Sequence, residues 1–576
     1  MCNIKYFFII SGIILWASQA CGATYYIDPT CSSSGDGTTT ACGTHGPFKT
    51  WAEAAWAPGN TYSQKGGTTA YEQITIGASN ITINSYGTGN AIINGGSAIP
   101  AGSWKGPDAN GVYSQPRFNS AILEDGIYLY NSHYTTPTNP PAGRYSAYWS
   151  QATEYYHPSS GTPANHTVEK VAAAGIELGL HNYVTIQGLS FTKVAYGIHS
   201  IPTSTGAASY ITITQNNFAN IEFGVWLSYY NATSANNSVT YNTFDSCFSG
   251  IEFYQAPGST SGGHSNVTIA NNTITHGGMV NSPTFAYDWD YVDMNGWDKE
   301  GIGFQDVSNS NVYNNSISGH VRGIEVYVNP SRTGNTNNYY NNYIITSRVP
   351  IEFQPNPTAT SFYSNNVYYN ILMNVEGVTL GGVDDLNPPG SGSDADEGYG
   401  MAFGNTSSPV STYNNVYNNT IYAGRGGGIM FGQYYAIRNN IVYGSSNAYM
   451  VGTSTNTIVD YNLYYLCQWN SCFLNGSQIP LATWKAAGFD THGLNVNPKF
   501  TNGNRAIPAS TPWVLSYPVP FNMIPSDFTL TSASPAIWTG INVGLTTDYA
   551  GNPVHNPPSI GAYEYFLHPP KGLRIE

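Results

Sequence analysis

The sequence predicts an all-β fold, a single-stranded right-handed parallel β-helix with an N-terminal helical cap. Three observations predict it. A short phrase, Asn followed by any residue and then an apolar residue, returns along a β-rich stretch between residues 210 and 443. Most copies lie 20 to 30 residues apart, with two longer intervals of 43 and 54. The sequence between copies reads as short strands without helical periodicity. The Asn positions are Asn216, Asn242, Asn272, Asn315, Asn342, Asn365, Asn419 and Asn439.

A repeat of this length is too short to bury its own apolar face, so its copies have to stack to form a core. Val, Ile, Tyr, Phe and Thr mark two or three short strands in each copy, and Asn and Gly interrupt them. At a coil corner we expect Asn to adopt left-handed backbone angles and to hydrogen-bond the Asn one rung away. The right hand follows from the general rule for crossovers between parallel strands.

The composition suits a solenoid and excludes one class of partner. Only 9% of the residues are charged, and the formal net charge is −14. No basic stripe is present to neutralise phosphates, so nucleic acid is not expected as a partner. The charge also disfavours polyanionic glycans unless a cation or a local Arg/Lys cluster reverses the field. The 46 Tyr residues offer flat apolar faces with polar tips, which suit a carbohydrate polymer.

The N-terminus, residues 1–23, has the pattern of a signal peptide. An apolar run, Tyr6–Trp16, is followed by small residues, and cleavage after Ala23 fits best. Cys21 raises lipidation as an alternative, although the residues before it lack the aliphatic first position of a lipobox. We therefore expect a secreted, extracellular monomer, with the periplasm and the cell surface as alternatives. No other stretch is long and apolar enough to cross a membrane.

Export to an oxidising compartment predicts two disulfides, each closing a short loop. The pairs are Cys31 with Cys42 and Cys467 with Cys472. No matching His cluster accompanies either pair, so neither reads as a zinc site. Cys247 remains, and we expect it to be a small buried hydrophobe.

The chain divides into three parts after the signal peptide. Residues 24–70 carry a strand, the Gly-rich disulfide loop and a short amphipathic helix over 47–55, which caps the open end of the solenoid. Residues 71–465 form the β-helix, with insertions near 97–170, 276–300 and 377–400. Residues 466–576 form a Pro-rich tail that packs on the helix.

Motifs at both ends of the mature chain carry a family resemblance. The entrance has Tyr25-Tyr26-Ile27-Asp28-Pro29 and Pro47-Phe48-Lys49-Thr50, and the tail has Asn497-Pro498-Lys499-Phe500, Asp548-Tyr549-Ala550-Gly551-Asn552-Pro553 and Ile560-Gly561-Ala562-Tyr563-Glu564-Tyr565. The chain resembles the secreted pectate-lyase-like right-handed parallel β-helix proteins over nearly its whole mature length. The resemblance implies the fold and leaves the activity open, since this fold hosts lyases, hydrolases, epimerases and non-catalytic surface proteins.

Four repeats contain strands with one shared phrase, in which Ile and Phe or Val alternate inward. Two outward columns result. The first column is Glu252, Gly303, Glu325 and Glu352, and the second is Tyr254, Gln305, Tyr327 and Gln354. On successive rungs, neighbours in a column stand about 4.8 Å apart.

This spacing matches the need of glycosidases for two carboxyl groups, about 5 to 5.5 Å apart in retaining enzymes and about 6.5 to 9.5 Å apart in inverting ones. Crowded carboxylates also raise the pKa of one, which makes a general acid. We expect Glu325 to be the acid/base and Asp306 or Glu352 to be its partner, with Gly303 leaving room for a sugar. Asp306 and Glu325 also resemble the acidic positions on adjacent coils of the β-helix xylosidase-like hydrolases.

The second outward column and Trp226 are the expected substrate-binding groups, and Glu252 completes the acidic set. A glycoside hydrolase is favoured on this basis, and the reaction requires no cofactor. Three nearby acidic residues, Asp288, Asp290 and Asp293, offer the oxygen ligands of an additional Ca²⁺ site.

Two other functions remain open. A polysaccharide lyase acting by β-elimination on a uronic-acid polymer needs a basic residue, and Lys299, Arg322 and Arg348 precede the outward strands. The same cations also serve as charge balance for the Glu column. A non-catalytic glycan-binding or adhesion solenoid, with Tyr and Trp226 as stacking platforms, is the third reading. A His in a nearby turn, such as His320, is a further candidate proton shuttle.

Overall fold

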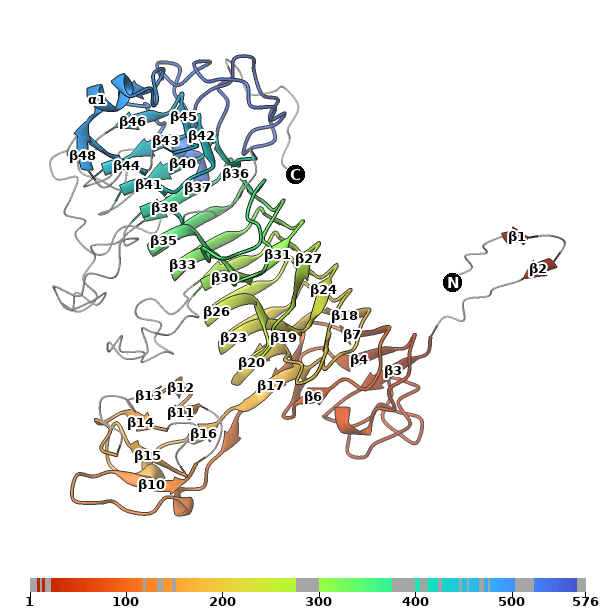
Figure 1. Ribbon diagram of the computed structural model, residues 1–576. Coiled ribbons are helices and arrows are strands. Elements are labelled where there is room, and N and C mark those ends of the chain that lie inside the picture. Colours follow the sequence, from red (N-terminus) through yellow and green to blue (C-terminus); the bar gives the residue numbers. More distant parts are fainter. Residues whose placement is uncertain are drawn as a thin grey trace.

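The structure, a computed structural model, describes most of the chain. The described residues are 8–10, 13–15, 22–117, 121–131, 138–147, 152–275, 300–374, 399–404, 412–422, 427–444, 448–452, 455–465, 471–474, 477–502 and 523–566. They form coils of parallel strands stacked along one axis, as the sequence predicts (Figure 1).

Each coil has three strand positions. The first position belongs to a 13-stranded parallel sheet, which we call the back sheet. Its strands are β3 (Thr24–Ile27), β4 (Thr61–Lys65), β7 (Ile81–Tyr86), β18 (Val184–Gln187), β22 (Thr212–Thr214), β25 (Ser238–Thr240), β28 (Thr268–Ala270), β32 (Asn311–Tyr313), β34 (Asn338–Tyr340), β36 (Asn366–Tyr368), β39 (Asn414–Tyr417), β42 (Tyr435–Arg438) and β45 (Ile458–Asp460).

The other two positions, here the first and second arm, belong to one 23-stranded sheet because several long strands bend from one arm into the other. These long strands are β23 (Asn217–Tyr230), β26 (Thr243–Gln255), β33 (Ser316–Val328) and β35 (Tyr343–Pro355). The shorter strands of the first arm are β5 (Thr69–Ala70), β8 (Ala91–Asn94), β19 (Leu189–Thr192), β29 (Thr273–Thr275), β37 (Ile371–Asn374), β40 (Thr420–Tyr422), β43 (Ile441–Tyr443), β46 (Leu463–Tyr465) and β49 (Leu494–Asn495). Those of the second arm are β6 (Ile74–Thr75), β17 (Ala172–Glu177), β20 (Val194–Ser200), β30 (Glu300–Gln305), β38 (Tyr399–Phe403), β41 (Gly427–Phe431), β44 (Ala448–Gly452) and β47 (Ser471–Leu474).

A column of glycines marks the corner between the two arms. A Cβ on Gly224 would lie 2.4 Å from Cδ1 of Phe244 and 2.5 Å from the carbonyl oxygen of Gly250. Real Cβ atoms do not approach this closely, so most rungs have a glycine at this corner, whereas Pro350 stands opposite Gly323. The column comprises Gly175, Gly197, Gly224, Gly250, Gly301, Gly323 and Gly400.

Inside the helix a ladder of buried Asn side chains joins the coils where the first arm begins. The backbone N–H and the Nδ2 of Asn216 both donate to Oδ1 of Asn242, at 2.9 and 3.1 Å. The ladder continues through Asn272, Asn315, Asn342, Asn370, Asn419, Asn440 and Asn462.

The predicted amide bonding between rungs is thus confirmed, but the left-handed residue is usually the one before the ladder Asn. Gln215 and Tyr241 have φ values of 56° and 57°. Among the eight predicted positions Asn439 is itself left-handed, with φ 57°, and it stands beside the ladder residue Asn440.

The insertion near 97–170 is a separate small module that stands beside the helix between β8 and β17 (Figure 1). Its strands are β9 (Ser97–Ala98), β10 (Tyr113–Pro116), β11 (Ile122–Glu124), β12 (Ile127–Tyr128), β13 (Tyr130–Asn131), β14 (Arg144–Ser146), β15 (Thr153–His157) and β16 (Val168–Lys170), and its 3-10 turns are η2 (Ala101–Ser103) and η3 (Pro163–Asn165). They make two four-stranded sheets around their own core, which includes Trp104, Tyr156 and Val168.

The N-terminal end differs from the prediction in two ways. Parallel stacking begins already at β3, which pairs with β4, rather than near residue 71. The expected helix over 47–55 is wrong: only a single 3-10 turn forms, η1 (Trp51–Glu53). The Glu53 carboxylate accepts the backbone N–H groups of Lys49 and Thr50, and Ala54 is already extended. Trp51, at the start of the turn, is buried, and its Nε1 donates to Gln64 at 2.7 Å.

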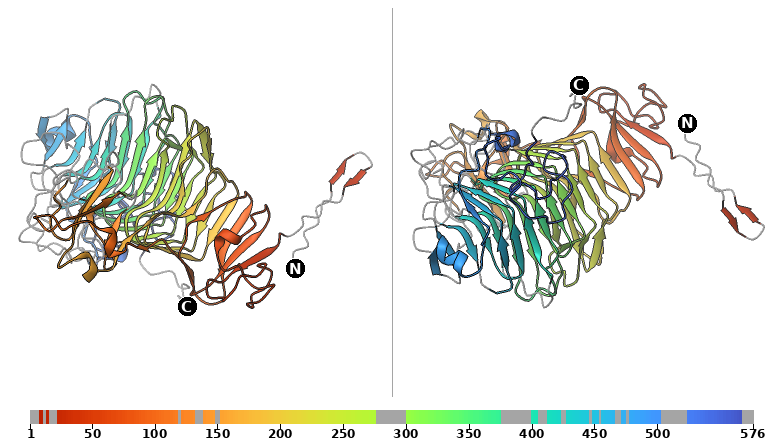
Figure 2. Two further views of the ribbon diagram at one scale, coloured as in Figure 1. Left: turned by 90° about the horizontal axis from the view of Figure 1, so that it is seen from below. Right: turned by 90° about the horizontal axis from the view of Figure 1, so that it is seen from above.

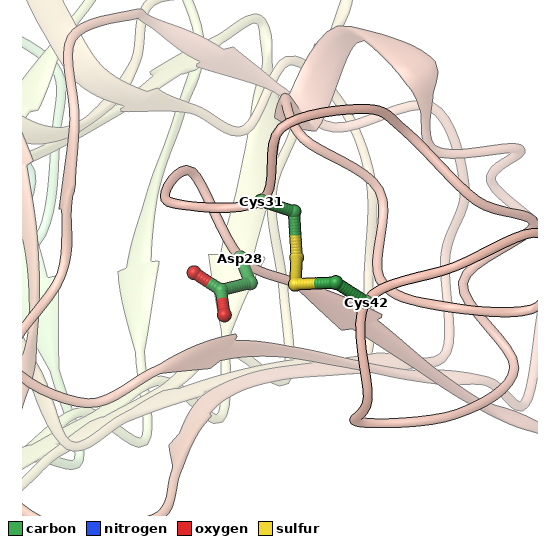
Figure 3. Close-up of side chains that lie close together, drawn as sticks. All are labelled: Asp28, Cys31 and Cys42. Carbon is green, nitrogen blue, oxygen red and sulfur yellow. A yellow bond between two sulfur atoms is a disulfide. The ribbon is translucent and has the colours of Figure 1, made fainter.

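The Cys31–Cys42 disulfide is confirmed and lies beside the buried Asp28 (Figure 3). Cys467 lies outside the described residues, so its predicted pairing with Cys472 stays a prediction. Cys247 is a buried free cysteine, as expected.

The described part of the tail packs on the first arm of the C-terminal coils (Figure 2). Phe528 in η4 (Pro525–Phe528) and Ile560 form one apolar cluster with Ile345, Met373 and Tyr422. The remaining elements are α1 (Leu481–Ala486), β48 (Ser477–Pro480), β21 (Gly206–Ala207), the three-stranded sheet of β24 (Ala232–Ala235), β27 (Gly262–Ser265) and β31 (Val307–Ser308), and an N-terminal pair, β1 (Phe8–Ile10) and β2 (Ile13–Leu15). Among the described residues, no helix is long and apolar enough to cross a membrane.

Candidate active site

The predicted acidic column exists on the outer side of the second arm. The strand register places Trp226, Glu252, Gly303, Glu325 and Glu352 opposite one another on successive rungs. The alternation of inward Ile and Phe or Val therefore gave the correct order of these residues.

Two further charged residues join the column from the corner between the arms. Glu300 and Arg322 pair opposite each other, each directly before a glycine of the corner column. The sequence analysis did not select Glu300. The signal was present, since Glu300 precedes Gly301 as Arg322 precedes Gly323. We call Glu252, Glu300, Glu325 and Glu352, together with Arg322, the glutamate face.

Arg322 is the centre of this face. Its Nη1 lies 3.3 Å from Oε1 of Glu300 and 3.6 Å from Oε1 of Glu325. Its Nε lies 2.5 Å from Oε2 of Glu352. One guanidinium thus contacts carboxylates from three successive rungs.

Neutral donors complete the contacts of the glutamate face. The Nε2 of Gln354 donates to Oε1 of Glu325 at 3.1 Å and to Oε1 of Glu352 at 2.6 Å. The hydroxyl of Tyr254 donates to Oε2 of Glu325 at 3.5 Å. Two members of the predicted second column therefore hold the carboxylates of the first.

The four carboxylates are buried, and Glu325 is the most exposed of them at 6%. Among the described residues, Arg322 contacts three of these carboxylates, and carboxyl groups crowded together in a buried site resist ionisation. Burial, together with the charges of Glu325 and Glu252, raises the pKa of Glu300 well above its ordinary value, and Glu300 also hydrogen-bonds Glu325. Glu300 is therefore a carboxyl group of this face that favours its protonated form.

The space above Gly303, which was predicted to leave room for a sugar, is occupied by the Glu252 side chain. A Cβ on Gly303 would lie 1.9 Å from Oε2 of Glu252. The carboxylate of Glu252 thus occupies the space that a side chain at position 303 would fill. The glycine is needed so that Glu252 can reach toward the rungs of Glu300 and Glu325.

Asp306 belongs to a different network, so its expected place in the same groove is wrong. Its Oδ2 accepts the hydroxyl of Tyr229 at 2.5 Å and Nδ2 of Asn329 at 2.8 Å, and its Oδ1 accepts the backbone N–H of Asn329 at 2.7 Å. Arg332 lies 3.7 Å from it. Burial raises the pKa of Asp306. These contacts are those of a left-handed corner residue that joins coils, with φ 57°.

Of the remaining predicted site residues, some are described by the structure and others lie outside the described residues. Gln305 and Tyr327 lie opposite each other in the second column, half-buried, and Oε1 of Gln305 accepts the backbone N–H of Gln255. His320 is inside a strand rather than in a turn, and burial lowers its pKa to about 4. Lys299 and the predicted calcium ligands Asp288, Asp290 and Asp293 lie outside the described residues, as does the side chain of Arg348.

Two groups of potential metal ligands occur among the described residues, both away from the glutamate face. One is Asp28 with Cys31 and Cys42, whose sulfurs are already joined in the disulfide. The other, in the module, is Glu124, Asp125 and His166, in which both ring nitrogens of His166 have protein partners. Neither group is the predicted calcium site.

Three long segments of the sequence separate a first-arm strand from the following second-arm strand. The module follows β8 and precedes β17, and residues 276–299 and 375–398, which lie outside the described residues, come between β29 and β30 and between β37 and β38. Connecting segments of this kind often carry binding and catalytic residues.

Residues 154–344 match a family model described as a right-handed beta helix region. Together with the sheet topology, this match confirms the predicted right-handed parallel β-helix. No curated protein matches the chain significantly.

Several solved structures align with the chain at low identity. A XylC complex with xylose covers 94% of this chain and 98% of its own, at 12% identity and a TM-score of 0.49. The pectate lyase Pel9A covers 95% and 97%, at 13% identity and a TM-score of 0.40. An alginate lyase from Paenibacillus sp. str. FPU-7 covers 55% and 88%, at 11% identity and a TM-score of 0.28. None of these similarities assigns a reaction to the chain.

Proposed function

Because the chain has the right-handed parallel β-helix fold of the pectate-lyase-like proteins, we propose that it is a carbohydrate-active enzyme that hydrolyses glycosidic bonds at the glutamate face. The observation that carries the proposal is the convergence of Glu300, Glu325 and Glu352 on Arg322. Stacked like charges are costly in a sheet, so a fold that needed only stability would avoid such a column.

Glu325 and Glu352 are the two working carboxyl groups in this proposal. They stand opposite each other on adjacent rungs, about 4.8 Å apart along the helix. This spacing is close to the roughly 5 to 5.5 Å of retaining glycosidases. Glu325, the most exposed of the four, donates the proton to the glycosidic oxygen.

Glu352 is then the nucleophile. The guanidinium of Arg322 and the amide N–H of Gln354 both stabilise its carboxylate. Its oxygen bonds to the anomeric carbon as the bond to the leaving sugar breaks. Glu325, now ionised, takes a proton from water, and the resulting hydroxide displaces Glu352 and restores both groups.

The contacts of Arg322 favour hydrolysis over β-elimination. A lyase needs a basic group to remove the proton at C5 and a cation to neutralise the uronate. Arg322 already contacts three carboxylates, so binding a uronate would add a further negative charge to the same guanidinium.

The test is Glu325→Gln, assayed on a polysaccharide panel with reducing ends and ultraviolet-absorbing unsaturated ends read in parallel. We expect turnover to fall at least about a hundredfold with the fold unchanged, because a general acid–base group is lost. The control is Asp490→Asn, another buried carboxylate-to-amide change, at the C-terminal end of the helix, which should keep turnover.

Full activity in Glu325→Gln contradicts the assignment. Unsaturated products, with activity lost only in Lys299 or Arg322 variants, identify a lyase instead. Sugar binding without any turnover in the wild-type protein identifies a non-catalytic glycan-binding solenoid.

A further inference from the structure

We propose that an aromatic patch next to the glutamate face binds uncharged sugar residues of a glycan chain that lies along the helix axis. The patch consists of Tyr196, Phe223, Trp226, Phe248 and Tyr254. This proposal rests on the proposed function, because the glycan bound by the patch is the one that the glutamate face would cleave. The expected ligand is a neutral glycan rather than a polyuronate.

The patch has two walls at right angles. Tyr196 and Phe223 stack on adjacent rungs, with centroids 5.0 Å apart and planes 14° apart. The indole of Trp226 lies at 77° to Tyr196 and 83° to Phe223. Phe248 lies edge-on to Phe223 at 6.1 Å. A pyranose ring has an apolar C–H face and hydroxyls at its rim, so it can pack its face on one wall and its edge on the other.

The patch continues directly into the glutamate face. Trp226 is opposite Glu252 on the preceding rung and stacks on Tyr254 at 5.2 Å and 24°. Tyr254 in turn donates its hydroxyl to Glu325. A glycan that extends along the helix from Glu325 toward the N-terminal coils therefore crosses the rings two to four rungs away.

The charges around the patch favour a neutral ligand. His199, one rung from Trp226, is 2.5 Å from Glu177, and Lys193 is 2.6 Å from Glu169. Both side chains already have a carboxylate partner. A uronate chain would bring further negative charge toward a face on which three carboxyl groups already converge on Arg322, whereas a neutral sugar brings no charge.

The small module supports the far edge of the patch. Ala121 and Leu123 of the module form one apolar cluster with Val171 and Ala195 of the helix, and Tyr196 packs against it. The patch is thus held between the module on one side and the glutamate face on the other. Aromatic side chains that are half-buried and fixed in this way lose little freedom when a sugar binds.

The test is calorimetric titration of the full-length Glu325→Gln protein with cellohexaose, xylohexaose, mannohexaose and hexagalacturonate. We expect at least one neutral hexasaccharide to bind more tightly than hexagalacturonate. Trp226→Ala and Tyr196→Ala, each combined with Glu325→Gln, should weaken that binding about tenfold, because a ring face is lost. Tyr340→Ala is the matched control, since Tyr340 is a half-buried ring stacked between Tyr313 and Tyr368 on the back sheet.

In the active protein, Trp226→Ala should raise KM for the hexasaccharide more than for the matching disaccharide, with kcat within about twofold of the wild type. Tightest binding of hexagalacturonate, failure of every probe to bind, or unchanged binding in both Ala variants overturns the proposal. If Glu325→Gln keeps full turnover while Trp226→Ala weakens binding, only the catalytic assignment falls and the subsite stands.

Discussion

Glu300 is the residue whose chemistry depends most on its neighbours. It is fully buried, contacts Arg322 at 3.3 Å and shares a hydrogen bond with Glu325. Two carboxyl groups this close do not both ionise easily, so Glu300 releases its proton at a higher pH than an isolated carboxyl group. Glu300 therefore acts through Glu325 as a positioning residue that keeps a proton available.

Glu300→Gln tests this role. The amide keeps the size of the side chain and removes the titratable group whose pKa is raised. We expect the alkaline limb of the kcat profile to move to lower pH by about one unit, while KM changes little. Glu564→Gln, which changes a buried carboxyl group of the tail, is the control and should leave the limb in place. An alkaline limb that does not move in Glu300→Gln rules out this role.

The site residues were predictable to the extent that strand alternation fixes their direction. Glu252, Glu325 and Glu352 follow alternation along straight segments, so their column was found correctly. Glu300 sits at the corner, where the bend turns a residue of inward parity out toward the glutamate face, and alternation does not foresee this. The filling of the space at Gly303 also escaped prediction, because it depends on the rotamer of Glu252.

At the scale of elements, corner chemistry decides the shape of the coil. The glycine column lets the backbone turn between the arms, and the Asn ladder satisfies backbone groups where the first arm begins. The repeat length and the recurring Asn predict these corners, so the fold could be predicted from the sequence. The cap at 47–55 was predicted as a helix, but a single turn forms and Ala54 is already extended.

The Asn ladder ends in a carboxylate, Asp490, whose Oδ1 accepts the backbone N–H of Asn462 at 3.0 Å. Tyr464 also donates to it. Burial raises the pKa of Asp490 to about 6, against 3.8 for the exposed group. Because the folded pKa is the higher one, the folded state holds the proton more tightly, and stability is lost as the pH rises from 3.8 to about 6.

Asp490→Asn extends the ladder by one amide and removes this titration. We expect the wild type to lose up to about 3 kcal/mol of unfolding free energy between pH 4 and pH 7 through this group, and the variant to lose less by that amount. Urea unfolding of both proteins at the two pH values measures the difference. Equal pH dependence in the two proteins would show that Asp490 does not titrate in this range.

At the scale of the whole molecule, the features proposed to bind and cleave a glycan lie on one face of the helix. The glutamate face, the aromatic patch and the module all lie at the corner between the first and second arm. A parallel solenoid accepts insertions at its corners without losing the pairing of its rungs. The module at 97–170 is therefore an addition to a helix that is complete without it.

The ends of the module meet, which makes its removal a direct test. The backbone N–H of Ala172 donates to the carbonyl oxygen of Gly95 at 2.9 Å, and Ser97 pairs with Lys170. Replacing residues 97–170 by a short Gly-Ser linker should leave a folded β-helix with one cooperative thermal transition, followed by circular dichroism. Binding of the neutral hexasaccharide should weaken about as much as in Tyr196→Ala, because Tyr196 loses the support of Leu123. A chain that no longer folds would show that the module is part of the solenoid core. Unchanged binding would show that the module does not support the aromatic patch.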